Sequence, residues 1–137
     1  MSRVLLARIE RFPIAGTFTI SRGSKTEAEV ICCTIGDGEL VGRGECVPYR
    51  RYGETLESVL DTIEASRPAV ESGATRSEIS RSMTPGAARN AVDCALWDLE
   101  AKRSGTPVRS LLCPQGTGPV ATAYTLSLGT PEAMAAQ

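Results

Sequence analysis

The sequence predicts an α+β fold in which a three-stranded antiparallel meander packs on a helical bundle. Apolar, β-branched segments separated by glycine-containing turns occupy the chain up to residue 47. Helical periodicity of apolar residues then dominates from residue 55 to residue 112. A new alternating segment begins at residue 120, after a stretch rich in glycine and proline. Strands followed by helices are typical of an α+β domain, and the last segment indicates that a second unit follows it.

The meander is predicted from three β-rich segments. These are Val4 to Ile9, Ala28 to Ile35 and Leu40 to Val47. Arg11 to Ser21 continues the first segment as extended chain, and we expect breaks at Pro13 and Gly16. A loop over residues 22–26 precedes the second strand. The glycine-rich residues 36–39 favour a tight hairpin turn before the third.

The longest predicted helix runs from Thr84 to Arg103. Thr84 is a natural N-cap, and Pro85 suits the first helical position because its missing N–H costs nothing there. Gly105 is a stop signal. The residues predicted to form its apolar face are Ala88, Ala91, Val92, Ala95, Leu96 and Leu99. The alanines in this set indicate that another element packs close to the helix backbone.

Shorter helices are predicted around this one. Thr55 caps a helix that runs to about Ser66, where Pro68 favours an end and Val70 favours a continuation. Further short helices are predicted from Thr75 to Met83 and from Val108 to Leu112.

The domain boundaries are predicted from composition. Residues 1–113 form the α+β domain, and residues 114–119 form a linker because they are rich in glycine and proline. Residues 120–137 read as one strand, with alternating apolar side chains from Val120 to Leu128, and a helix that begins at Thr130 and Pro131. One strand and a short helix cannot bury their own apolar faces. We therefore expect them to be the start of a truncated β/α domain.

Composition excludes several classes of protein. Fifteen basic and sixteen acidic residues give a net charge of −1, without the basic patch that nucleic acid or an anionic membrane surface requires. Charged residues interrupt the N-terminus too early for a signal peptide, so a cytoplasmic location is expected. The five cysteines are expected to be reduced, small hydrophobic residues. Because the chain has no histidine, histidine-based triads and zinc sites are excluded.

The residues alone do not supply a catalytic set. Asp93 and Asp98 point to different sides of the long helix, and Glu45 is inward or solvated. We expect such acids to cap helices or to pair with Arg89 and Lys102, and none of them has metal-ligand spacing.

Two loops carry candidate binding residues. Arg22 lies between small, flexible residues, and its guanidinium group suits a carboxylate. Tyr49 and Tyr52 flank two arginines in a loop that could line the mouth of a pocket. For both loops the alternative is an exposed polar surface without a ligand. From the residues alone, the prediction stops at an α+β domain with two candidate binding loops.

Three motifs resemble a known family. They are GRGECVPYRRYGETLESV from Gly42 to Val59, ARNAVDCALWDLEAK from Ala88 to Lys102, and TAYTLS from Thr122 to Ser127. Together they resemble the enolase superfamily, within it the muconate-lactonizing-enzyme subgroup, and most of all the dipeptide epimerases of the L-Ala-D/L-Glu type. The resemblance covers essentially the whole chain.

The resemblance implies an enolase N-terminal-domain-like cap that closes the active-site mouth of a (β/α) barrel. In this family Mg²⁺ stabilises an enediolate formed by removal of the proton α to a carboxylate, and lysines act as bases. By the resemblance, those lysines and the metal ligands lie beyond Gln137, so residues 1–137 alone are expected to be inactive. The resemblance also implies two covering loops, Ile14 to Ser24 and Pro48 to Gly53. The residues it implies for substrate binding are Arg22, Tyr49, Tyr52, Thr125 and Ser127.

Several functional hypotheses remain open at this point. The first is the substrate-specificity cap of a Mg²⁺-dependent dipeptide epimerase, whose partners are a dipeptide or other carboxylate and the barrel. The second is a non-catalytic binding or interaction module, because the apolar side chains of residues 120–128 favour self-association into a homo-oligomer. The third is the cap of another enzyme of the subgroup, a cycloisomerase or an o-succinylbenzoate synthase.

Overall fold

The structure is a computed structural model that describes residues 3–116 and 118–137. Residue contacts divide the chain into two units. The first holds residues 3–10 with 30–116, and the second holds residues 11–29 with 118–137. Strands β1 (Val4–Ile20) and β2 (Gly23–Asp37) contribute to both units, and each unit is described by itself.

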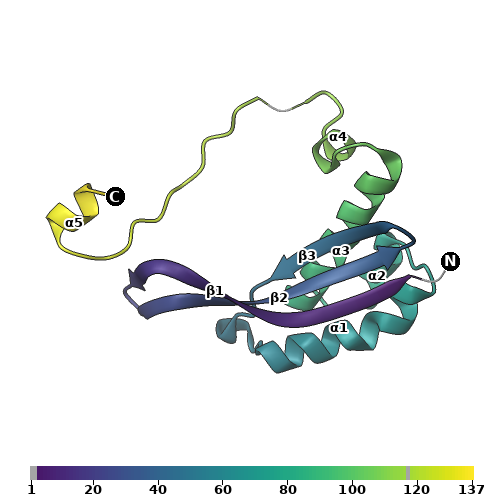
Figure 1. Cartoon of the computed structure of the whole chain (residues 1–137), viewed down its shortest axis with the longest axis horizontal. Helices are drawn as coiled ribbons and strands as arrows, with labels where there is room; N and C mark the ends of the chain where they lie inside the picture. The colour runs from purple at the N-terminus through teal and green to yellow at the C-terminus, as the bar shows by residue number, and fades with distance from the viewer. Residues whose placement is uncertain (1–2, 117) are drawn as a thin grey trace. The chain divides into compact units, whose positions relative to one another are not determined.

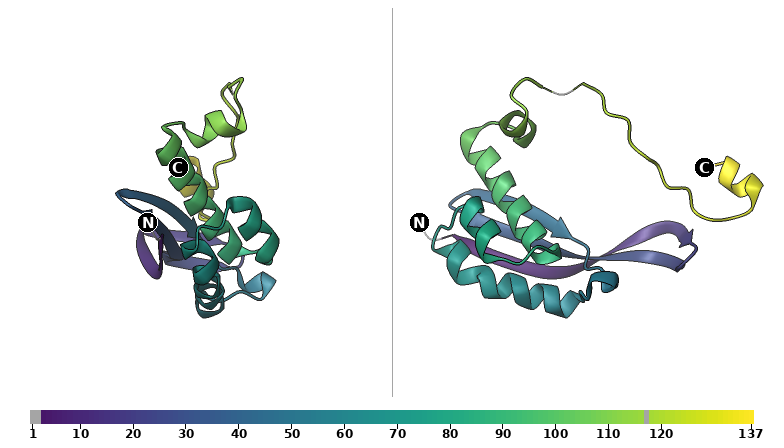
Figure 2. Two further views of the ribbon diagram at one scale, coloured as in Figure 1. Left: turned by 90° about the vertical axis from the view of Figure 1, so that its right-hand side faces the viewer. Right: turned by 180° about the vertical axis from the view of Figure 1, so that it is seen from behind.

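The first unit is a three-stranded sheet whose one face is covered by helices (Figures 1 and 2). The strand order is β1-β2-β3, with β3 at Leu40–Cys46, and β2 pairs antiparallel with β3 in the register Ile31↔Cys46 to Asp37↔Leu40. The helices are α1 (Leu56–Glu71), α2 (Arg76–Ser82), α3 (Ala87–Ser104) and α4 (Val108–Leu112). The predicted α+β fold and its antiparallel meander are confirmed.

The core of this unit lies between the sheet and the helices. Alternation along β2 turns Ile31, Cys33 and Ile35 inward, where they are fully buried, and Leu5 of β1 joins them. Helices α1, α2 and α3 supply the other side of the core. Its largest fully buried helical side chains are Ile63, Val70, Ile79, Val92 and Leu99.

Strand β3 lies unusually close to α3. A Cβ atom on Gly44 would overlap the carbonyl oxygen of Ala91 and lie only 2.8 Å from the nitrogen of Ala95. A Cβ atom on Gly42 would meet Leu99 in the same way, at 2.7 Å from its Cβ. Glycine on the strand and alanine on the helix therefore let two backbones come into direct contact. All six residues predicted for the apolar face of the long helix are buried in α3.

Three predicted element boundaries are wrong. Helix α3 starts at Ala87 with Gly86 as its N-cap residue, so Thr84 and Pro85 precede the helix. Strand β1 continues from Val4 to Ile20 without a break at Pro13 or Gly16. Because β1 is an edge strand, the absent N–H of a proline can face away from the sheet. Strand β2 begins at Gly23, so the predicted loop over residues 22–26 is reduced to a turn at Ser21 and Arg22.

Helix α1 resolves the alternative that the sequence left open. It continues through Pro68 to Glu71, and Thr55 caps its start through a capping box with Ser58. The predicted short helices correspond to α2 and α4. Among the helices of residues 3–116 and 118–137, none combines the length and apolar character that a bilayer-spanning helix needs.

The free edge of β1 is partly covered by side chains from α1. The backbone N–H of Leu5 donates to Glu71 Oε1 at 3.1 Å, and the carbonyl oxygen of Leu5 accepts a hydrogen bond from Arg67 Nη1. Arg67 and Glu71 are themselves ion-paired at 3.1 Å, one helical turn apart. The N–H donation from Leu5, followed by the hydrogen bond from Arg67, lowers the pKa of Glu71. These backbone groups are therefore satisfied without a neighbouring strand.

The second unit contains a β-hairpin and the C-terminal segment. The outer parts of β1 and β2 form the hairpin, and Gly16 adopts a φ of +80°, which glycine adopts without strain. The predicted strand from Val120 to Leu128 is not formed, since residues 118–130 carry no strand. The alternation is present in the sequence, but this segment makes no ladder with any other described segment. Helix α5 (Pro131–Ala135) begins with the predicted cap, because Thr130 accepts the N–H of Ala133.

Candidate functional site

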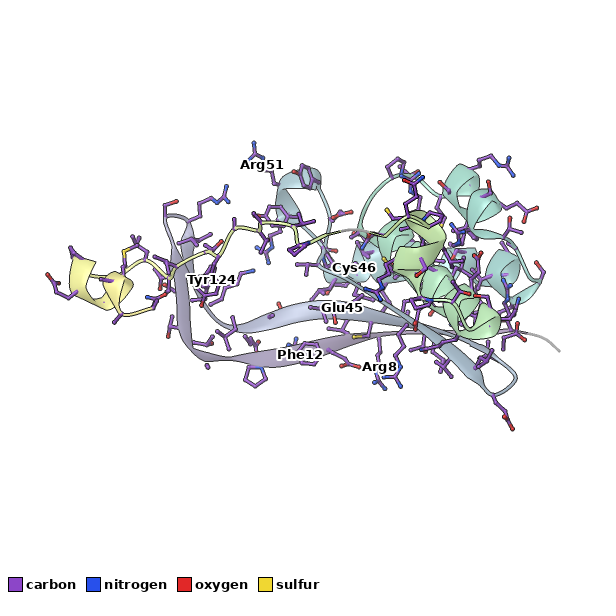
Figure 3. All side chains as sticks on the ribbon, turned by 90° about the horizontal axis from the view of Figure 1, so that it is seen from above. Arg8, Phe12, Glu45, Cys46, Arg51 and Tyr124 are labelled. Atoms are coloured by element: carbon purple, nitrogen blue, oxygen red, sulfur yellow. The ribbon has the colours of Figure 1, made fainter. Side chains whose placement is uncertain are left out.

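The tyrosine loop, residues Pro48 to Glu54, follows directly from the end of β3. It contains one turn of 3-10 helix, η1 (Arg50–Tyr52), and closes at Gly53, which adopts the left-handed conformation with a φ of +77°. The rings of Tyr49 and Tyr52 lie 5.7 Å apart between centroids and are tilted by 38°. Figure 3 shows Arg51 pointing away from the ribbon of this loop, so its guanidinium group extends into solvent.

The carboxylate of Glu54 joins the tyrosine loop to the start of α3. One oxygen accepts the backbone N–H of Tyr49 at 3.0 Å, and the other accepts the N–H of Ala87 at 2.7 Å. The first N–H groups of a helix have no partner within it, and a carboxylate there is also favoured by the helix dipole. Glu54 therefore does what was expected of Thr84. This role is not apparent from the sequence, because Glu54 and Ala87 are 33 positions apart.

A shallow pocket of about 530 Å³ lies between the tyrosine loop and the start of α3. Both tyrosine rings border it and remain accessible, since Tyr49 is 43% and Tyr52 is 77% exposed. The residues that line it are Cys46, Val47, Tyr49, Tyr52, Glu54, Pro85, Gly86, Ala87 and Asn90. Its lining contains no lysine or arginine, and its one carboxylate is already occupied by two backbone donors. The pocket therefore suits an uncharged group better than a second carboxylate.

Arg22 lies in the second unit, at the tip of the hairpin. It occupies the two-residue turn between β1 and β2 with an exposed side chain. Thr19 and Ser24 face each other across the turn, with their hydroxyl oxygens 2.9 Å apart. Within the described ranges of the chain, no ion pair engages Arg22. The predicted covering loop from Ile14 to Ser24 is therefore largely a paired hairpin, and only its tip is a turn.

Ser127 contacts the same hairpin, and Thr125 does not. Ser127 Oγ accepts the N–H of Thr19 at 3.0 Å and donates to the carbonyl oxygen of Thr17 at 3.2 Å. The N–H of Leu128 donates to the carbonyl oxygen of Thr19 at 2.8 Å. Thr125 is exposed, without a hydrogen bond among the described residues. The structure thus brings Ser127 near the hairpin that carries Arg22, whereas Tyr49 and Tyr52 belong to the other unit.

Of the acids that were considered for catalysis, Asp98 has a structural role, whereas no ion pair of Asp93 or Glu45 is found among the described residues. Burial alone would raise the pKa of Asp98, but hydrogen bonds from Lys102 and from the N–H of Arg43 outweigh it and lower that pKa. The predicted pairing of Lys102 is confirmed at 2.6 Å from Asp98. Arg89 instead donates to the carbonyl oxygen of Ser80. Glu45 is exposed at the end of β3 (Figure 3).

The cysteines show no sign of activation. Burial raises the pKa of the Cys33 thiol to about 12 and that of the Cys46 thiol to about 11. All five cysteines are free thiols. A nucleophilic thiol requires a lowered pKa, so these two buried residues are part of the core.

A second pocket, of about 700 Å³, lies beside α2 and α3 and was not predicted from the sequence. Most of its charged side chains are already paired. The Arg76 guanidinium group stacks at 3.2 Å from the centre of the Trp97 ring and bonds Glu100 at 2.7 Å. Arg103 bonds Asp37 at the same pocket. The contacts of Arg76 hold α2 against α3, and Asp93 is the lining carboxylate for which no ion pair is found among the described residues.

The described residues do not form a metal site. No group of three or more histidine, cysteine, aspartate or glutamate side chains within residues 3–116 and 118–137 is arranged to hold a metal ion. Mg²⁺ prefers several carboxylate and water oxygens in octahedral geometry. The side chains of the described residues therefore do not provide a binding site that fits Mg²⁺.

Comparisons with known proteins give a consistent result. A family model for the mandelate racemase / muconate lactonizing enzyme N-terminal domain matches residues 4–113. The L-Ala-D/L-Glu epimerase of Escherichia coli K12 is 43% identical over 126 residues, which are 92% of this chain and 39% of that protein. The N-acetyl-D-glutamate racemase of a Pseudoalteromonas species is 40% identical over 109 residues, or 77% of this chain and 34% of that protein.

A solved structure agrees with these relatives. An enolase family member from Agrobacterium tumefaciens with homology to dipeptide epimerases, bound to sodium and L-Ala-L-Glu, is 57% identical with a TM-score of 0.89. The match covers 98% of this chain and 41% of that one. The chain thus spans about two fifths of the length of such relatives. It belongs to the mandelate racemase / muconate lactonizing enzyme N-terminal domain family of the enolase superfamily.

Proposed function

We propose that this chain is the substrate-specificity cap of a Mg²⁺-dependent dipeptide epimerase, an enzyme that inverts the carbon α to a carboxylate. The observation that carries the proposal is the 57% identity to a structure that holds L-Ala-L-Glu. In this proposal residues 1–113 are the cap, residues 114–119 the linker and residues 120–137 the start of the barrel. The metal ligands and lysine bases belong to the part of the enzyme that these residues do not include.

The proposal assigns substrate contacts to the two exposed loops and the C-terminal segment. Arg22 binds a substrate carboxylate, because a guanidinium group offers two parallel N–H donors to it. Tyr49 and Tyr52 cover an uncharged part of the substrate, in keeping with the lining of their pocket. Thr125 and Ser127 contribute hydroxyl groups. Closure of cap on barrel would then exclude water from the reacting carbon.

A second candidate substrate is favoured by one comparison. The Pseudoalteromonas relative is an N-acetyl-D-glutamate racemase, whereas the E. coli relative is an L-Ala-D/L-Glu epimerase. Alanyl-glutamate and N-acetyl-glutamate are both glutamates acylated on nitrogen. We therefore propose N-acylated glutamate as the substrate class, with the dipeptide as its first member and the N-acetyl compound as its second.

The test is a chimera that joins residues 1–137 to the rest of the E. coli relative. We expect it to exchange the α-proton of L-Ala-L-Glu with D₂O, followed by ¹H NMR, while residues 1–137 alone with Mg²⁺ do not. Arg22→Gln should raise KM by roughly 10-fold or more, since a hydrogen bond between charged groups is worth about 1.5–3 kcal/mol. Lys25→Gln, three residues along the same hairpin, is the matched control. Exchange by the isolated chain, or equal KM values for both variants, would contradict the proposal.

A further inference from the structure

The carboxylate of Glu54 is the only described side chain that bonds both the tyrosine loop and the first turn of α3. Its two oxygens accept one backbone N–H each, from Tyr49 at 3.0 Å and from Ala87 at 2.7 Å. An ionised carboxylate suits this arrangement because it is an acceptor at both oxygens. Hydrogen bonds to a charged acceptor are also stronger than those between neutral groups.

The loop has little else to hold it against the helix. Its other backbone hydrogen bonds among the described residues are internal: the N–H groups of Tyr52 and Glu54 donate to the carbonyl oxygen of Tyr49 at 2.8 and 3.4 Å, and Gly53 donates to Arg50 at 3.0 Å. These bonds set the shape of the turn, but they do not set where the turn lies on the domain. Between its attachments to β3 and α1, the loop is therefore tied to the start of α3 through Glu54.

We propose that Glu54 is a positioning residue that fixes the two tyrosine rings over their pocket and thereby sets substrate affinity. The part of this inference that concerns substrate rests on the proposed function. Glu54 has no expected contact with the reacting carbon. Its loss should therefore weaken binding, measured as KM, and leave kcat nearly unchanged.

Gly86 offers an independent way to disturb the same contact. A Cβ atom on Gly86 would lie 2.8 Å from Glu54 Oε1, closer than an ordinary contact. Gly86→Ala therefore displaces the carboxylate while its charge and length stay the same, and it also strains the backbone at the start of α3, where φ is +159°. Glu54→Gln keeps the length but replaces one acceptor with an NH₂ donor, which faces a backbone N–H. Both variants should have the same effect although they change different residues.

The first measurement is amide hydrogen exchange in residues 1–137, followed by NMR. We expect Glu54→Gln and Gly86→Ala each to speed exchange of the Tyr49 amide by about 10-fold, because a lost charge-assisted bond opens the loop locally. The amide of Val59, which donates to the carbonyl oxygen of Thr55 in α1, should change by less than about 2-fold. Glu39→Gln, at an exposed acid in the β2–β3 turn, is the control. Unchanged Tyr49 exchange in both variants would overturn the proposal.

The second measurement is the split between KM and kcat in the chimera with the E. coli relative. We expect Glu54→Gln and Gly86→Ala to raise KM for L-Ala-L-Glu by about 5-fold or more, with kcat within about 2-fold. Faster Tyr49 exchange with an unchanged KM would overturn the positioning role. An inactive chimera with the natural cap would contradict the proposed function alone, because amide exchange tests the contact without any substrate.

Discussion

Replacing Gly44 with alanine tests whether the β3–α3 contact holds the domain together. The new Cβ would lie 2.0 Å from the carbonyl oxygen of Ala91, where ordinary contacts begin at 3.4 Å, so α3 must retreat by roughly 1.4 Å. It would also lie 2.8 Å from the Ala95 nitrogen, and neither backbone can rotate away as a side chain would. A gap of this size forfeits about half or more of the dispersion energy at each contact across it. The six buried residues of α3 would share that loss.

The expected destabilisation for Gly44→Ala is about 2–3 kcal/mol or more. Overpacking typically costs up to about 3 kcal/mol, and the smaller entropy of alanine in the unfolded chain returns about 0.4–1 kcal/mol. Gly36→Ala is the matched control in the same sheet, because its Cβ would lie 3.8 Å from the carbonyl oxygen of Val4. We expect the control to change stability by less than about 1 kcal/mol.

Urea unfolding measures both variants with a probe on the helix itself. Trp97 is the single tryptophan of the chain and lies in α3, so its fluorescence reports on this contact. Circular dichroism at the same urea concentrations would show whether unfolding is two-state. If Gly44→Ala unfolds within about 0.5 kcal/mol of the natural chain, with an unchanged m-value, the close contact does not carry the stability assigned to it here.

Two further predictions concern titratable groups. Glu71 has a lowered pKa in the folded chain. Its contribution to stability is therefore present above the pKa of an ordinary glutamate, about 4.3, and is lost as pH falls through the lower folded value. The difference in Tm between the natural chain and Glu71→Gln should shrink as the pH falls from about 6 to about 3. A difference that grows at lower pH would contradict the role of the Leu5 contact. Burial raises the pKa of Cys33 to about 12 and that of Cys46 to about 11. Both thiols should therefore resist alkylation at pH 8, while the exposed Cys113 reacts. Equal alkylation rates, measured by mass spectrometry, would show that the core opens readily.

The fold was predictable where local sequence determines structure. The apolar face of α3 follows from spacing alone, and the alanines in it correctly indicated a close neighbour, although Gly42 and Gly44 were not identified as that neighbour. Thr55 was likewise predicted to cap α1, although its capping box with Ser58 was not. Periodicity and caps involve residues within one or two turns of each other, so a single sequence contains the necessary information.

The errors arose where distant residues interact. Thr84 has the right chemistry for an N-cap, but Glu54 takes that role from another part of the chain. Pro13 is a strand breaker in isolation, yet β1 tolerates it because only one side of that strand is paired. The sequence predicts that Arg22 is exposed and charged, but its proposed partner is the carboxylate of a substrate and not a residue of the chain. Its assigned contact therefore remains a prediction.

The side chains that cover the edge of β1 have a consequence for the order of events during synthesis. Arg67 and Glu71 lie 62 and 66 residues after Leu5, so a ribosome has finished the strand long before it makes the residues that protect it. At about 5–20 residues per second, the interval is roughly 3–13 s. The nascent chain therefore has an unprotected strand edge while it is still on the ribosome, close to other nascent copies on the same mRNA. Codon choice between residues 6 and 71 would lengthen or shorten that exposure without changing the folded protein.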